Sequence, residues 1–156
     1  MRELILMRHA AALAAPAGAS DLERPLSELG RLEAAQAAQR LAGTAAIERI
    51  LFSPARRTSE TAQIIAGELA LAAQALVAMP ALYVATAAVI RAAVAHNHGG
   101  ANVVLIIGHN PGISEFGCEL AGLGFHAQLP TAGFWRRSLG AQAWQALIDE
   151  AGPENQ

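Results

Sequence analysis

Short apolar runs alternate along the chain with longer segments whose apolar residues recur at helical spacing. The apolar runs predict strands at residues 3–7, 49–52, 75–78 and 102–107. Continuous apolar runs of this length are typical of strands that are covered on both faces. The run at 102–107 (NVVLII) is apolar and rich in β-branched residues, so we expect it near the centre of the sheet.

The segments between these runs predict helices. Ser27 is a suitable N-cap for a helix that starts at Glu28 and ends at Gly43. Ser53 and Pro54 predict the start of a second helix that continues to about residue 69, because serine caps free N–H groups and proline suits the first helical position. Two more helices are expected, over residues 86–95 and from the turn at 108–112 to about residue 122.

The remaining segments complete a single-domain prediction. Residues 96–100 predict a polar loop, and residues 131–139 and 143–148 predict an edge hairpin around a turn at 140. We expect residues 1–150 to form one domain and residues 151–156 a frayed tail. The alternation of strands and helices predicts an α/β fold of three layers, with helices on both faces of a mostly parallel sheet.

Composition narrows the possible partners. The chain has 156 residues, and its 11 basic residues are all arginine, with a net charge of −2 at pH 7. This balance gives no general attraction to nucleic acid or to anionic membranes, so a phosphate site would need locally placed arginines. No stretch reaches the ~20 apolar residues of a membrane span, and the N-terminal run is interrupted at Arg8 and His9. We therefore expect a cytoplasmic protein.

Metal, disulfide and cofactor chemistry are not expected. Cys118 is the single cysteine, so it forms no intrachain disulfide, and its apolar surroundings indicate a buried thiol. His96 and His98 resemble a metal-ligand pair, but no third ligand stands at metal spacing beside them. The sequence therefore predicts neither a metal nor a cofactor.

Polar residues follow three of the predicted strands. Arg8-His9 follows the first strand, residues 53–57 (SPARR) follow the second, and His109-Asn110 follows the central one. Ligands of open α/β sheets bind at the carboxyl ends of the strands, where helix N-termini favour anions. An imidazole can attack phosphorus while guanidinium groups hold the phosphoryl oxygens. Each segment alone is also an ordinary turn or cap, and their coincidence at one sheet edge favours phosphoryl chemistry.

Four stretches in chain order resemble the motifs of the histidine phosphatase superfamily, and specifically its short SixA-type phosphohistidine phosphatase branch. They are LMRHA at 6–10, RPLS at 24–27 with Gly30, SPARR at 53–57 with Thr61-Ala62, and GHNP at 108–111. The third match selects Arg57 over Arg56 as the site arginine. The resemblance covers nearly the whole chain and implies the phosphoglycerate mutase-like fold.

The resemblance also implies a division of labour. His9 would become transiently phosphorylated, while Arg8, Arg57 and His109 bind the phosphoryl group and stabilise the transition state. Water would then hydrolyse the phosphohistidine without a metal ion. Asn110 is a further candidate for substrate binding.

The general acid of this superfamily is not evident in the sequence. Most members carry a carboxylate shortly after the third strand, but residues 82–86 (LYVAT) contain none, and the SixA-type branch shares this gap. Asp21 and Glu115 are weak candidates for the acid. Arg24 is expected either to contact the substrate or to form a structural salt bridge.

The leading functional hypothesis is a monomeric phosphohistidine phosphatase that acts on a phosphorylated protein domain in signal transduction. A short chain without long insertions predicts a shallow, open pocket suited to a phosphorylated side chain on another protein. Two alternatives remain open at this point: a broad phosphomonoesterase acting on small phosphate esters, and a non-catalytic phosphoprotein-binding module. His9 argues against the module, because binding alone requires only the arginines.

Overall fold

The computed structural model describes residues 1–124, 127–140 and 142–151. These residues form a five-stranded sheet in the order β3-β2-β4-β1-β5. In chain order the elements are β1 (Arg2–Arg8), the 3-10 turn η1 (Asp21–Glu23), α1 (Glu28–Ala42), β2 (Arg49–Phe52), α2 (Arg56–Glu68), η2 (Ala73–Ala75), β3 (Leu76–Ala78), η3 (Pro80–Leu82), α3 (Ala87–Asn97), β4 (Val103–Gly108), α4 (Gly112–Leu120), β5 (Phe134–Leu139) and α5 (Ala143–Ala151).

The sheet is parallel except at one edge. β4 lies at its centre, paired in parallel with β1 and β2, and β3 continues the parallel set beyond β2. β5 runs antiparallel to β1 and forms the edge. The central position predicted for the NVVLII run is confirmed, because its side chains are buried from both faces of the sheet.

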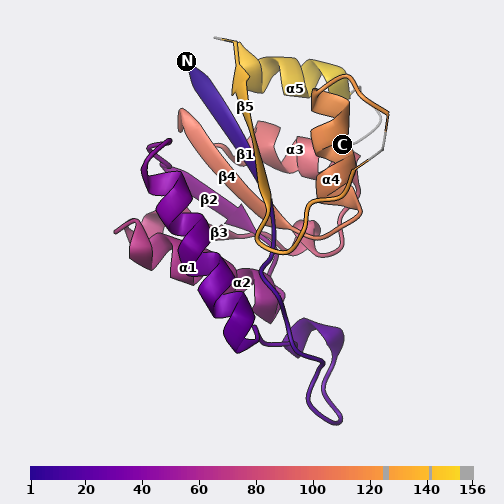
Figure 1. The fold of residues 1–156 in the computed structure, drawn as a ribbon. Coiled ribbons are helices and arrows are strands. Elements are labelled where there is room, and N and C mark those ends of the chain that lie inside the picture. The colour runs from indigo at the N-terminus through magenta and orange to yellow at the C-terminus, as the bar shows by residue number, and fades with distance from the viewer. Residues whose placement is uncertain (125–126, 141, 152–156) are drawn as a thin grey trace.

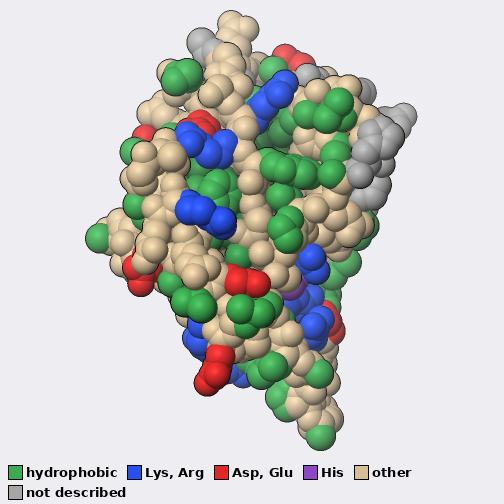
Figure 2. All heavy atoms as spheres, in the orientation of Figure 1, with side chains coloured by type: hydrophobic (Ala, Val, Ile, Leu, Met, Phe, Trp, Pro, Cys, Tyr) green, Lys and Arg blue, Asp and Glu red, His purple; other side chains and the backbone are tan. Residues whose placement is uncertain are grey.

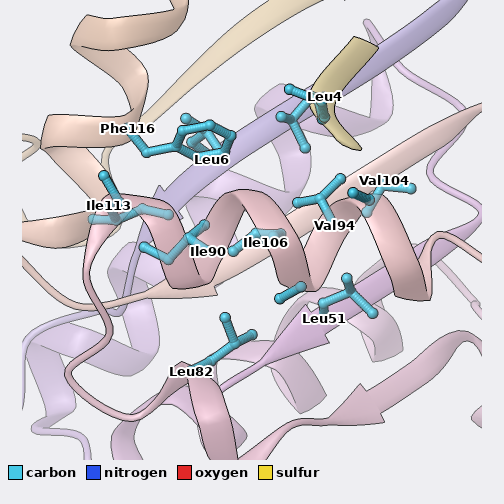
Figure 3. Packing of buried hydrophobic residues seen from close by; sticks show 14 of the residues in the cluster. Leu4, Leu6, Leu51, Leu82, Ile90, Val94, Val104, Ile106, Ile113 and Phe116 are labelled. Carbon is cyan, nitrogen blue, oxygen red and sulfur yellow. The ribbon is translucent and has the colours of Figure 1, made fainter. Parts of the chain in front are cut away.

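Helices cover both faces of this sheet, with α1 and α2 on one side and α3, α4 and α5 on the other (Figure 1). The alternation of side chains along β1 divides its residues between two cores. Leu4 and Leu6 belong to the core beneath α3 and α4, whereas Ile5 and Met7 pack beneath α1 and α2. Figure 3 shows the first of these cores, in which Ile90 and Val94 of α3 lie over the sheet. The predicted three-layer α/β class is confirmed.

The predicted C-terminal hairpin is wrong in its second half. β5 lies at the sheet edge as expected, but the segment after Gly140 forms α5 rather than a returning strand. Trp144, Leu147 and Ile148 stand at helical spacing and pack into the core beneath α3. The Trp144 indole N–H donates to the Ala101 carbonyl at 3.1 Å, which satisfies its polar atom inside the core.

Two predicted boundaries also need correction. α2 begins at Arg56 with Ala55 as its N-cap, so Pro54 precedes the helix instead of opening it. The predicted polar loop at 96–100 begins later, because His96 and Asn97 belong to α3. The Asn97 amide donates to the Ala93 carbonyl at 2.9 Å and so remains compatible with the helix. The tail predicted at 152–156 lies outside the described residues.

Candidate active site

Three loops meet at the carboxyl edge of the parallel strands. Strand pairing sets Arg8 beside Gly108 and Phe52 beside Ile107, so β1, β2 and β4 end next to one another. The segments that follow carry His9, Arg57 and His109. Figure 2 shows a small area of histidine surface bordered by arginine side chains at the lower end of the sheet in this view. The predicted juxtaposition of these groups is therefore present in the structure.

His9 lies on the floor of this pocket with 8% of its surface exposed. Its Nδ1 lies 2.8 Å from the carbonyl oxygen of Ala10. Because a carbonyl can only accept, Nδ1 carries the proton and Nε2 is left with its lone pair free. Burial lowers the pKa of His9 to about 4, and the positive charges of Arg57 and Arg8 act in the same direction. His9 is thus a neutral, oriented imidazole at physiological pH.

We expect the His9 imidazole to stay unprotonated down to about pH 4, well below the ordinary range, because burial and nearby cations disfavour its charged form. The Nε2 lone pair would then remain available in mildly acidic solution and be lost as the pH falls through that value. Titration of the imidazole nitrogens by NMR measures this, with a His9→Gln variant to assign the resonances. A midpoint near the ordinary ~6.5 would contradict the prediction.

His109 faces His9, with the two ring centroids 5.4 Å apart. Its Nδ1 lies 3.3 Å from Nη2 of Arg57, and its Nε2 lies 2.8 Å from the hydroxyl of Ser53. A guanidinium only donates, so Nδ1 accepts and Nε2–H donates to Ser53. Burial, followed by the charge of Arg57, lowers the pKa of His109 to about 3. Ser53 therefore orients His109, a role not expected when it was interpreted as a helix cap.

Arg57 places a guanidinium inside the pocket, with only 5% of its side chain exposed. Its Nη1 donates to the Asp21 carbonyl at 2.9 Å, and its Nη2 donates to the Asp21 carboxylate at 3.0 Å. Arg8 donates from Nη1 to the Leu129 carbonyl at 3.3 Å. The Nε atoms of Arg8 and Arg57 are buried and have no acceptor among the described residues. A buried Arg57 and a half-buried Arg8, each with a buried free Nε–H, lie near a neutral histidine and make a site suited to an oxyanion.

Arg56, the neighbour of Arg57, points elsewhere. Its side chain is 53% exposed and forms an ion pair with Glu60 at 2.8 Å, one turn along α2. Consecutive residues of a helix differ by about 100°, so the two arginines face different sides. The choice of Arg57 as the pocket arginine agrees with this geometry.

Arg24 lies near the pocket and supports the loop that borders it. Its Nε donates to the Leu13 carbonyl at 3.0 Å, and its Nη1 lies 3.4 Å from the carboxylate of Asp21. Its charge contributes to lowering the pKa of His9, after burial and the charges of Arg57 and Arg8. The structural salt bridge considered for Arg24 is present, and a direct contact with substrate stays a prediction.

The Asn110 side chain is occupied by contacts within the protein. Its Nδ2 donates to the Leu129 carbonyl at 2.9 Å, and its Oδ1 accepts from the hydroxyl of Ser114. The Leu129 carbonyl also accepts from Arg8. These contacts give Asn110 a positioning role, because it holds the carbonyl that accepts from Arg8, and its predicted contact with substrate stays a prediction. Glu115 stands in the first turn of α4, as expected.

Tyr83 is a residue of the site that the sequence patterns did not single out. Its hydroxyl donates to the Asp21 carboxylate at 2.5 Å, and its ring meets the His109 ring edge-on at 5.6 Å. A Cβ at Gly112 would collide with the Ala85 carbonyl, so the start of α4 packs directly against the loop that carries Tyr83. The signal in the sequence was its position, after the third strand, where the superfamily usually carries its acid.

The described residues show neither a metal-ligand cluster nor a membrane-spanning helix. The part of the chain that the structure describes contains no group of three or more His, Cys, Asp and Glu side chains arranged to hold a metal ion. Among the described helices, none has both the length and the apolar character needed to cross a membrane. Cys118 is buried, as expected.

The fold and the site together define an α/β protein with an arginine–histidine oxyanion pocket at the carboxyl edge of its sheet. Residues 4–83 match the family model described as histidine phosphatase superfamily (branch 1). The chain belongs to this superfamily and has its phosphoglycerate mutase-like fold. No match was found among curated protein sequences.

Solved structures extend the comparison over most of the chain. A candidate phosphohistidine phosphatase SixA from Nakamurella multipartitia is 30% identical, with a TM-score of 0.75, over 94% of this chain and 88% of that one. A second candidate SixA, from Agrobacterium tumefaciens, is 25% identical with a TM-score of 0.79, over 88% of this chain and 92% of that one. The protein histidine phosphatase SixA complexed with tungstate is 27% identical with a TM-score of 0.79, over 90% of each chain. The protein is therefore a histidine phosphatase-family phosphatase with a SixA-like structure.

Proposed function

We propose that this protein is a protein phosphohistidine phosphatase that works through a phosphorylated His9. The observation that carries the proposal is the orientation of His9: Nδ1 is held by the Ala10 carbonyl, Nε2 is left free, and the positive charges of Arg57 and Arg8 lie close by. The lone pair of Nε2 attacks phosphorus as the bond to the leaving group breaks. Arg8 and Arg57 hold the phosphoryl oxygens, and His109 joins them when its Nε2–H turns from Ser53 to the phosphoryl group. Water then cleaves the P–N bond to His9.

The tungstate complex of the SixA relative supports an oxyanion pocket in this fold. Tungstate is a tetrahedral oxyanion, as phosphate is. The site of the present chain offers buried N–H donors from Arg8 and Arg57 for such a group. Binding of phosphate esters at this position follows from the charge and geometry of those donors.

The substrate class follows from the side chains near the leaving group. Residues 82–86 supply a tyrosine but no carboxylate, and the Asp21 carboxylate is held ionised by its contacts with Tyr83 and Arg57. The pocket thus has a nucleophile and cations but lacks an evident proton donor for a strongly basic leaving group. A phosphorylated imidazole needs none, because its free ring nitrogen takes a proton from solvent near neutrality.

We expect the enzyme to hydrolyse phosphohistidine faster than an aryl phosphate, and an aryl phosphate faster than an alkyl phosphate. An alkoxide's conjugate acid has a pKa near the ~15.7 of water, and a phenol's lies near ~10, whereas a protonated phosphoimidazole ring leaves as neutral imidazole. The measurement is kcat/KM for the three classes at neutral pH. Alkyl phosphates hydrolysed as fast as aryl ones would contradict the proposal and indicate a small-molecule phosphomonoesterase.

A further inference from the structure

We propose that Asp21 is a specificity-determining residue that accepts a hydrogen bond from the protonated ring nitrogen of a phosphorylated imidazole. The proposal rests on the phosphohistidine phosphatase function proposed above. It names the residue that would recognise the imidazole leaving group of that substrate. Asp21 was considered in the sequence only as a weak candidate for a general acid. Its contacts assign it the opposite role, that of an anionic acceptor.

The position of Asp21 is the first reason. Its Oδ2 accepts from Arg57 Nη2 at 3.0 Å and from the Tyr83 hydroxyl at 2.5 Å, and both donors contact His109. The Asp21 side chain is nevertheless 46% exposed, whereas His9 is only 8% exposed. The carboxylate therefore extends toward solvent from the buried Arg57 and His109, whereas His9 is buried beside His109.

The geometry of phosphoryl transfer is the second reason. The attacking and leaving atoms stand roughly in line on opposite sides of phosphorus. His9 is buried, so an in-line leaving group departs on the side away from it, and we place it at the solvent-exposed side of Arg57 and His109, where Asp21 and Tyr83 lie. The part of the substrate that distinguishes phosphohistidine from other phosphate compounds therefore arrives next to Asp21.

The charge of Asp21 is the third reason. The hydrogen bond from Tyr83, followed by the contacts with Arg57 and Arg24, lowers the pKa of Asp21 to about 2. The carboxylate is therefore ionised at neutral pH and cannot donate a proton. Its Oδ1 has one long contact, 3.4 Å to Arg24, so it retains capacity to accept a hydrogen bond.

The chemistry of the substrate completes the match. A phosphorylated imidazole that is protonated on its free nitrogen carries a positive ring charge and one N–H. When His9 Nε2 bonds to phosphorus, the P–N bond of the substrate breaks and its electron pair returns to the ring. The proton stays on the other nitrogen, and neutral imidazole departs. Asp21 would favour this protonated form, whereas an aryl phosphate offers neither the charge nor the N–H.

The test compares phosphoimidazole with p-nitrophenyl phosphate, since both phosphorylate His9 and then share one hydrolysis step. We expect Asp21→Asn to lower the ratio of their kcat/KM values, phosphoimidazole over aryl phosphate, by about tenfold or more, as when a hydrogen bond to a charged group is lost. Glu23→Gln is the matched control. It removes the same charge from the same turn, where Glu23 contacts Ser20 and not the pocket, and should leave the ratio unchanged. Asp21→Ser provides a second uncharged variant if the first does not fold.

The outcomes separate the two proposals. An equal loss on both substrates would show that Asp21 only holds Arg57 in place, and would overturn the specificity role while leaving the phosphatase function intact. A wild-type enzyme that hydrolyses p-nitrophenyl phosphate but not phosphoimidazole would overturn the phosphohistidine function itself, and this inference with it.

Discussion

Replacing His9 by alanine is expected to abolish turnover, with kcat falling by about 10³-fold or more, while phosphate binding persists. The reason is that the proposed mechanism needs the free Nε2 of His9 as the attacking atom, whereas the charge proposed to bind phosphate resides on Arg8 and Arg57. Steady-state kinetics with p-nitrophenyl phosphate measures the loss of turnover. Calorimetric titration with inorganic phosphate measures the binding that remains.

Trapping a phosphoenzyme tests directly whether His9 becomes phosphorylated. Brief incubation of the wild-type enzyme with a labelled substrate should leave an acid-labile, base-stable phosphoryl group, as expected for phosphohistidine. The His9→Ala variant should carry no label. If that variant retained more than a few per cent of wild-type activity, His9 would not be the nucleophile.

Loss of Arg57 is expected to lower kcat/KM by about 10²-fold or more, the range seen when one preorganised electrostatic group is removed. The Arg57 guanidinium is only 5% exposed and contacts both His109 and Asp21, so water cannot take its place with the same geometry. Arg8→Ala should cause a loss of similar size. Comparing the kcat/KM of Arg57→Ala with that of Arg57→Lys distinguishes the effect of the positive charge from that of the planar guanidinium. The lysine variant keeps the charge alone and should recover only part of the activity.

Arg56→Ala is the matched control for this prediction. It removes the same side chain one position earlier, where Arg56 is 53% exposed and paired with Glu60. Because the Arg56 side chain is largely solvated, and Glu60 keeps its contacts with Arg31 and the Leu26 N–H when Arg56 is lost, the variant should be nearly silent in activity and folding. A larger loss from Arg56 than from Arg57 would mean that the assignment of the pocket arginine is wrong.

Much of the sheet could be predicted because its signals are local. The run at 102–107 carries apolar side chains on both faces, and such a strand must be covered on both sides. β4, which this run forms, lies at the centre of the sheet. Ser27 and Gly43 bound α1 as expected, because capping depends on one side chain and its nearest backbone groups. Trp144 and Leu147 were misassigned, because a short apolar segment suits a strand or a helix until its packing partner is known.

The order of residues is enough to predict which chemical groups the protein has and which strand ends carry them: His9, Arg57 and His109 follow strands whose parallel pairing brings them to one edge. How these groups are held depends on tertiary contacts. Ser53 orients His109 across 56 positions of the chain, and Tyr83 reaches Asp21 across 62. Such contacts depend on how loops from different strands meet, and no local pattern records them. The tautomers of both histidines, the low pKa of His9 and the anionic state of Asp21 all arise from burial and from neighbours that are distant in sequence.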